Sequence, residues 1–144
     1  MKITIEEPKI GENDEIIIKC HHLNPEIMHL LSKLKSQNTL IAYIDNEIHR
    51  LLPSSIYYIE SVNNKTFLYA SDATYESKHK LYELEEILQS HDFLRVSKSF
   101  IINIDKIKSF VPVFSGRLEA VLTNGERVVI SRQYVNALKE RLGV

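Results

Sequence analysis

Cationic side chains gather in one stretch of this sequence, where they could neutralise a polyanion. Between residues 93 and 135, seven Lys and Arg residues stand against three acids, a net charge of +4 in a chain whose formal net charge is -1. The seven cations are Arg95, Lys98, Lys106, Lys108, Arg117, Arg127 and Arg132. Several of them flank turn signals and so lie at the ends of predicted strands. Basic loops on a β scaffold favour a polyanion as the partner.

Three predicted turns carry side chains that can read duplex DNA. They are residues 63–66 (Asn-Asn-Lys-Thr), residues 95–99 (Arg-Val-Ser-Lys-Ser) and residues 131–133 (Ser-Arg-Gln). Arg and Lys pair with O6 and N7 of guanine, and Asn or Gln pairs with N6 and N7 of adenine. Taken alone, these residues are more typical of an ordinary solvated turn.

Catalytic and metal-binding patterns are sparse. His21 and His22 are adjacent, which sends their side chains to opposite faces of a strand, and His79 and His91 flank a predicted helix. The sequence has no H-x-x-x-H, C-x-x-C, P-loop, G-x-S-x-G or G-x-G-x-x-G motif. Cys20 lies in an apolar run and is predicted to be a buried structural thiol. We therefore expect no catalytic residue, no metal, no cofactor and no small-molecule substrate.

The apolar pattern predicts a mainly β fold of short antiparallel strands. Runs suited to strands lie at residues 40–44, 47–51, 56–62, 66–70, 74–77, 100–104, 107–113, 118–122 and 128–130. Asn124-Gly125 separates two of these runs and predicts a two-residue hairpin turn, because both residues accept positive φ angles. Short helices are predicted at residues 80–89 and 135–142.

The first 39 residues are predicted to form a ββα extension ahead of the β domain at residues 40–144. Apolar runs at residues 1–7 and 15–22 predict two strands, and Asn24-Pro25-Glu26 is typical of a helix start. The helix is expected to end near Gln37-Asn38 and to carry one apolar stripe, made of Ile27, Leu30, Leu31 and Leu34. Residues 1–15 hold two cations and five acids. We expect this acidic extension to dimerise, or to dock on the β domain, rather than to bind DNA.

Composition indicates the compartment. No apolar run approaches the ~20 residues of a membrane span. The first 15 residues lack the apolar region of a signal peptide. The single cysteine excludes an internal disulfide and fits a reducing compartment. We expect a cytoplasmic protein.

Three segments resemble the LytTR (LytR/AlgR-type) family of DNA-binding domains. Residues 93–110, FLRVSKSFIINIDKIKSF, look like the family element F-x-R-x-H-R-S-x-x-V-N-x-x-x-I. Residues 124–142, NGERVVISRQYVNALKERL, are similar to its closing segment G-x-x-x-x-x-S-R-x-x-x-x-x-L, and residues 56–70 are similar to its opening I-x-Y-I-E. The three occur in family order and cover roughly residues 40–144. One departure is Ser97-Lys98, where the family often has His-Arg, and it bears on base preference.

The resemblance implies a bacterial transcriptional regulator with an elongated stack of small antiparallel sheets, whose loops touch double-stranded DNA. Carried over residue by residue, it implies base or near-base contacts at Thr66, Lys98 and Arg132. The neighbouring residues implied are Asn64, Lys65, Ser97 and Gln133. A homodimer on paired sites is implied as well.

The resemblance also bears on control. Many family regulators carry a receiver domain of more than ~100 residues before the DNA module. Only residues 1–39 precede the resemblance here, so we expect the stand-alone type. Its activity would be set by expression level, by dimerisation, or by a partner that holds it, such as a regulatory membrane protein.

Plainer interpretations remain beside these. Arg95 contacts phosphate or serves as a structural ion-pair partner. Lys106 and Lys108 are expected on one strand face, where they touch phosphate or merely solubilise the sheet. Asn103 is expected to cap backbone near a strand end. The alternative function is a non-catalytic protein–protein interaction module that uses residues 111–114 and the N-terminal helix. Its affinity would depend weakly on salt, whereas DNA affinity falls steeply.

Overall fold

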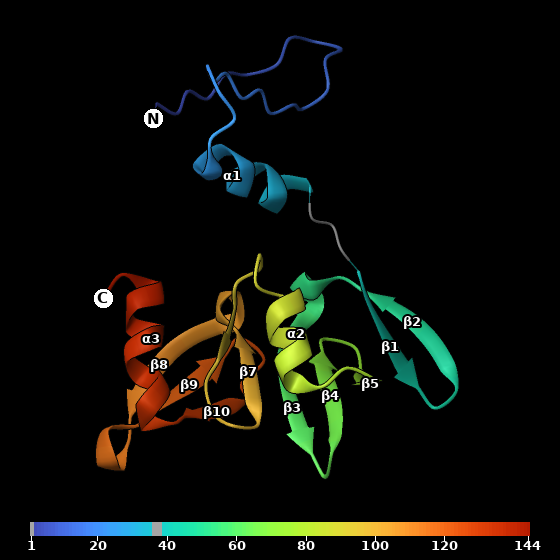
Figure 1. The fold of residues 1–144 in the computed structure, drawn as a ribbon, viewed down its shortest axis with the longest axis vertical. Helices are drawn as coiled ribbons and strands as arrows, with labels where there is room; N and C mark the ends of the chain where they lie inside the picture. The colour runs from blue at the N-terminus through green and yellow to red at the C-terminus, as the bar shows by residue number, and fades with distance from the viewer. Residues whose placement is uncertain (1, 36–38) are drawn as a thin grey trace.

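Most of the regular structure in the described residues consists of ten strands in two antiparallel sheets (Figure 1), which confirms the mainly β prediction. The computed structural model describes residues 2–35 and 39–144. We call residues 2–35 the N-terminal segment and residues 39–144 the β module. The larger sheet has the strand order β2-β1-β5-β4-β3-β7-β6, and the smaller sheet has the order β10-β9-β8.

The strand boundaries predicted within residues 40–130 are confirmed to within a residue or two, and β6 is an additional strand. The larger sheet contains β1 (Leu40–Ile44), β2 (Glu47–Leu51), β3 (Ile56–Val62), β4 (Lys65–Ala70), β5 (Thr74–Ser77), β6 (Phe93–Arg95) and β7 (Phe100–Asn103). The smaller sheet contains β8 (Ile107–Pro112), β9 (Leu118–Leu122) and β10 (Arg127–Ile130). Short 3-10 turns, η1 (Pro53–Ser55), η2 (Ile104–Lys106) and η3 (Phe114–Gly116), join some of them.

Two hydrophobic cores lie on opposite faces of β7. Ile101 and Ile102 are consecutive, so their side chains point to opposite faces of the strand, and both are fully buried. Ile101 belongs to a core with Ile59, Leu68 and Leu84, whereas Ile102 belongs to a core with Ile130 and Leu138. Burying side chains on both faces fixes the register of β7, because a slip of one residue would exchange the two cores.

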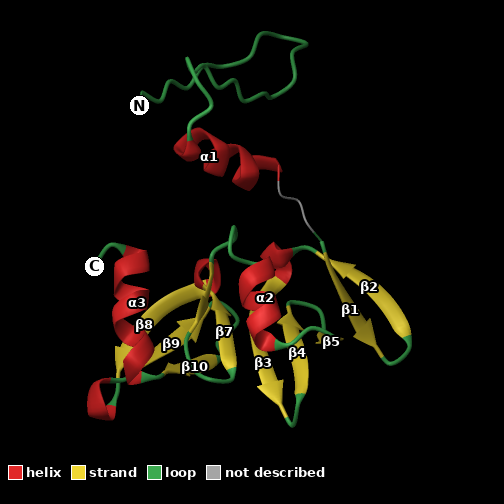
Figure 2. Ribbon diagram, viewed as in Figure 1, coloured by secondary structure: helices red, strands yellow, loops and turns green. Residues whose placement is uncertain are grey.

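One helix covers each core (Figure 2). Helix α2 (Leu81–Ile87) buries Leu81 and Leu84 against the larger sheet. Helix α3 (Arg132–Leu142) buries Val135 and Leu138 against the smaller sheet. Helix α3 begins three residues before the predicted start at residue 135, which places Arg132 in the first helical turn rather than in a loop.

The two-residue hairpin turn predicted at Asn124-Gly125 is not found there, although two other turns of this length are present. Asn63 and Asn64, between β3 and β4, both have positive φ (50° and 64°), and Val62 pairs with Lys65 across the turn. At Asn124-Gly125 only Gly125 has a positive φ, 90°. There Gly125 N–H donates to Leu122 O at 2.9 Å, and Leu122 N–H donates to Glu126 O at 2.8 Å. The predicted hairpin between β9 and β10 is therefore real, but its turn is longer than two residues.

The N-terminal segment contains one helix and no strand between residues 2 and 24. The strands predicted at residues 1–7 and 15–22 are therefore wrong for the described residues: a strand needs a neighbour to pair its backbone groups, and none lies beside this segment. Cys20 is exposed, so the predicted buried thiol is wrong for the same reason.

The predicted helix start is confirmed. In α1 (Pro25–Lys35), Asn24 Oδ1 accepts a hydrogen bond from Ile27 N–H at 2.8 Å. The expected helix end near Gln37-Asn38 lies outside the described residues. Ile27 is buried, but Leu30 and Leu34 remain 37% and 46% exposed, so the apolar stripe is only partly covered. Figure 1 shows α1 standing apart from both sheets.

Candidate nucleic-acid interface

Backbone hydrogen bonds join the three loops that the sequence singled out. Ser61 N–H, at the end of β3, donates to Ser99 O at 2.8 Å. Ser131 N–H, at the start of α3, donates to Val96 O at 2.9 Å. The β6–β7 loop, residues 96–99, is therefore attached to the β3–β4 turn on one side and to the start of α3 on the other. In Figure 1 that turn and the first turn of α3 both lie at the lower edge of the view.

The β3–β4 turn presents Asn64 and Lys65 to solvent and holds Thr66 back. Asn64 and Lys65 are exposed, whereas Thr66 is only 5% exposed, paired with Ser61 and Ser77 on the neighbouring strands. Thr66 nevertheless lines a hollow of about 390 Å³, which also receives Asn64, Lys65, Arg95 and Lys98. We call it the basic hollow. The structure thus brings together predicted residues from two of the three loops in one depression.

Arg95 organises the β6–β7 loop. Its Nε donates to Ser97 O at 2.9 Å, and its Nη2 donates to Lys98 O. Its Nη1 lies 3.9 Å from Glu85 Oε2, a distance that makes only a loose ion pair. A further bond within the loop runs from Ser99 N–H to Ser97 Oγ at 3.2 Å. These bonds fix the loop backbone and leave Lys98, which is exposed, free to project.

The start of α3 presents Arg132 and Gln133, both exposed. The aliphatic stem of Arg132 crosses the turn between β8 and β9. A Cβ added to Gly116 would lie 3.2 Å from Arg132 Cδ, so the glycine permits this close approach. Gly116 also has a φ of 73°, which L side chains rarely adopt. Neither Arg132, Gln133 nor Ser97 lines the basic hollow.

Lys106 and Lys108 do not share a strand face, so that expectation is wrong. Lys106 closes the 3-10 turn η2, where its Nζ lies 5.1 Å from the centre of the Tyr57 ring. Lys108 is exposed on β8. The predicted capping role of Asn103 is confirmed: its Oδ1 accepts from Asp105 N–H at 3.1 Å, and its Nδ2 donates to Ile56 O at 2.8 Å.

Two stacked tyrosines lie on the strands that lead into the β3–β4 turn. The rings of Tyr58 and Tyr69 are 4.3 Å apart, and Tyr69 Oη donates to Glu60 Oε2 at 2.8 Å. Burial and then this hydrogen bond raise the pKa of Tyr69 to about 12, and burial is also the main cause of a raised pKa at Tyr58. Both phenols are therefore neutral at physiological pH and add no negative charge near the loops.

Sequence reasoning missed two elements at this edge. Lys78, His79 and Lys80 connect β5 to α2 and line the basic hollow. The sequence signal was a run of basic residues after a short strand. The second element is the turn at η3, where Phe114 is 89% exposed beside the Gly116–Arg132 contact. The sequence indicates Phe114 only as part of the apolar run at residues 111–114, which suits a protein-binding surface.

Among residues 2–35 and 39–144, no three His, Cys, Asp or Glu residues are grouped so that they could hold a metal ion. None of the helices in these two ranges is long and apolar enough to cross a bilayer.

The stacked antiparallel sheets, with cationic loops fixed at one edge, define a β-type nucleic-acid-binding module. Residues 46–143 match the family model of the LytTr DNA-binding domain, and the chain belongs to this family. The solved LytTr DNA-binding domain of a Bacillus cereus protein, described as a methyl-accepting/DNA response regulator, has the same fold. The TM-score is 0.70 at 28% identity, and the match covers 74% of this chain and 97% of that one.

Relatives extend the likeness over nearly the whole chain. Two Staphylococcus aureus proteins, from strains NCTC 8325 and N315, are 31% and 30% identical over 142 residues, which is 99% of this chain and 89% of each relative. Both are named uncharacterized HTH-type transcriptional regulators. In the described residues of this chain, strands separate each α-helix from the next, so the helices do not form a helix-turn-helix pair.

Proposed function

We propose that this chain is a sequence-specific transcriptional regulator that binds double-stranded DNA through loops at the ends of its strands. One observation carries the proposal. Backbone hydrogen bonds from Ser61 to Ser99 and from Ser131 to Val96 hold all three candidate loops in fixed register. A rigid set of loops can match the spacing of groove edges without a cost for ordering them on binding. The family and the names of the S. aureus relatives support the regulatory role.

The base contacts are assigned to the exposed side chains of this edge. Lys98 is the long, exposed cation of the β6–β7 loop, and Arg132 is that of the first turn of α3. Asn64 and Lys65 serve the first loop, with Thr66 behind them in the wall of the basic hollow. Ser97 and Gln133 are the neighbours of Lys98 and Arg132.

The basic residues outside the three loop tips are proposed to have roles other than base contact. Arg95 acts mainly by holding the β6–β7 loop. Lys106 and Lys108 supply phosphate contacts at most, since neither lies in the three loops.

Selection from a random duplex pool, followed by fluorescence anisotropy, tests this function. We expect one sequence to be enriched, and its affinity to fall with salt by a log–log slope of about -0.9 per phosphate contacted. If no sequence is enriched and binding is indifferent to salt, the proposal fails.

The N-terminal segment is proposed to join two copies of the chain. Its Ile3, Ile5 and Ile16 are 85%, 92% and 73% exposed, and α1 leaves Leu34 uncovered. Exposed apolar side chains in this number favour association. The acids in residues 1–15 disfavour contact with phosphate. A second copy would bring two DNA modules to paired sites, and sedimentation velocity measures whether it does.

The same exposed side chains favour a second candidate role, the binding of a regulatory protein, such as a membrane protein that holds the chain. On this proposal the chain is a cytoplasmic, non-catalytic regulator. A pull-down that depends on residues 2–35 but not on Arg132 would support the second role.

A further inference from the structure

The basic hollow is bounded by three separate segments of the larger sheet. They are the β3–β4 turn, the β6–β7 loop and the connection from β5 to α2. Its volume is about 390 Å³, and it is open to solvent. Five cationic side chains line it: Lys65, Lys78, Lys80, Arg95 and Lys98. Only two of these five, Lys78 and Lys80, come from outside the loops already assigned to DNA.

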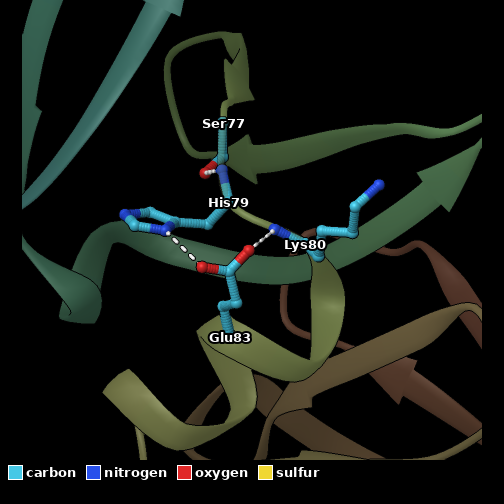
Figure 3. Close-up of polar contacts among 4 residues, drawn as sticks. All are labelled: Ser77, His79, Lys80 and Glu83. Carbon is cyan, nitrogen blue, oxygen red and sulfur yellow. Dashed lines mark hydrogen bonds and ion pairs between the residues drawn. The ribbon is translucent and has the colours of Figure 1, made fainter.

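The β5–α2 connection is held in a defined conformation (Figure 3). Ser77 Oγ accepts a hydrogen bond from His79 N–H at 3.1 Å. Glu83 Oε1 accepts from Lys80 N–H at 3.0 Å, and Glu83 Oε2 lies 3.4 Å from His79 Nδ1. The backbone bond from Lys80, then the His79 contact, lower the pKa of the Glu83 carboxyl, so it stays charged. Because Glu83 occupies the Lys80 amide, that N–H is not available to an anion in the hollow.

The positive charge of the hollow is poorly balanced from within. Glu76 supplies the only carboxylate among the residues that line it. Glu83 is turned to Lys80 N–H and His79, and Glu85, which lies 3.9 Å from Arg95 Nη1, does not line the hollow. Lys78 Nζ lies 4.5 Å from the centre of the Tyr43 ring, which orients it without neutralising it. Cations that share a depression repel one another, and a bound anion removes that repulsion.

We propose that the basic hollow binds one backbone phosphate of the DNA duplex, with Lys78 and Lys80 as phosphate-contacting residues. The inference rests on the proposed DNA-binding function and deepens it. The hollow lies directly beside Lys98 and Asn64, so a strand read by those side chains passes over it. A phosphodiester fits the lining because lysine ammonium groups bind phosphate as point charges, without a fixed geometry. Such a contact anchors the duplex and carries no sequence information.

Lys78→Gln and Lys80→Gln test the inference in the full-length chain, because glutamine keeps the length of the stem and removes the charge. Each variant should reduce the magnitude of the log–log salt slope, and the variant with both substitutions should reduce it by about 0.9, the contribution of one phosphate. The loss of affinity should be equal on the selected duplex and on a random duplex. Lys139→Gln, in the last turn of α3, removes the same charge away from the hollow and should leave the slope unchanged. Thermal unfolding confirms that the variants remain folded.

Two further arms separate a DNA phosphate from a free phosphate ion. A methylphosphonate scan of the selected duplex should find one linkage whose neutralisation weakens wild-type binding but not the Lys80→Gln variant. Inorganic phosphate should compete with DNA no better than chloride does at equal ionic strength. The inference is overturned if the wild type binds DNA and both lysine variants show the same salt slope as the wild type. It is also overturned if inorganic phosphate saturates the hollow without displacing DNA. If the wild type binds no duplex at all, it is the proposed function that fails.

Discussion

The β module and the N-terminal segment contain similar apolar residues, which are buried in the first region and exposed in the second. In the β module, Ile101 and Ile102 are fully buried between paired strands. In the N-terminal segment, Ile3 and Ile5 alternate with polar residues just as a strand requires, yet they are 85% and 92% exposed and unpaired. The difference lies in the neighbours, because strand structure depends on cross-strand partners and not on the alternation alone. The β module supplies those partners to itself, whereas the N-terminal segment has none among residues 2–35 and 39–144.

Removal of residues 1–38 is the strongest way to sharpen this comparison. If the segment joins two copies, the truncated chain should still bind a single half-site but should lose the gain from bivalent binding, about 10²–10⁴-fold on the paired site. Sedimentation velocity and anisotropy on single and paired sites measure the two effects. Equal affinity of both chains for the paired site would exclude a dimerising role.

Replacing an isoleucine by alanine should destabilise the protein in the β module but not in the N-terminal segment. Ile101→Ala removes a fully buried side chain and should lower the free energy of unfolding by about 2–5 kcal/mol, since it leaves a cavity between the larger sheet and α2. Ile3→Ala, the matched control in the N-terminal segment, should change it by less than about 0.5 kcal/mol in the monomer. Urea unfolding at low protein concentration gives both values. A large effect at Ile3 would mean that the segment packs on the β module.

Within the β module, Arg132 and Lys108 distinguish base contact from phosphate contact. Arg132→Ala should reduce discrimination between the selected and random duplexes by about 1–3 kcal/mol. Lys108→Ala should act equally on both duplexes, or not at all. Competition anisotropy measures the discrimination. Equal losses on both duplexes for Arg132→Ala would reassign Arg132 to the phosphate backbone.

Two glycines in the smaller sheet test whether the β8–β9 turn positions Arg132. Gly116→Ala and Gly125→Ala both place a side chain at positive φ and should each cost about 1 kcal/mol of stability. Only at Gly116 does the new Cβ meet Arg132, so only that variant should also alter discrimination; at Gly125 nothing lies within 4 Å. Identical DNA binding by the two variants would show that the contact is incidental.

The smallest effect concerns the acid side of the pH range. The lowered pKa of Glu83 means that its contacts with Lys80 N–H and His79 stabilise the fold above the ordinary pKa of 4.5 and are lost as pH falls through the lowered value. Glu83→Gln should therefore reduce stability slightly at neutral pH and make it less sensitive to pH below 4.5. Urea unfolding at a series of pH values measures this. A parallel loss at every pH would exclude the charge as the cause.

The sequence by itself determined the strands of the β module, the helix start at Asn24, the cap at Asn103 and the family. These are local or strongly patterned features: alternation, turn residues, a side chain that bonds to its own neighbourhood, and motifs in a fixed order. Sequence also marked the three loops, because their residue types suit base and phosphate contacts.

The tertiary structure decided which of the candidate DNA-binding residues lie close together and which are exposed. Arg95 alternates with Val96 as an outward strand residue does, yet its guanidinium folds back on Ser97 O and Lys98 O. Thr66 is held behind Lys65 because Ser61 and Ser77 flank it. Lys78 and Lys80 joined the site only through the pairing of β5 with β4. The N-terminal strands failed because pairing is a property of two segments, and a sequence pattern describes only one of them.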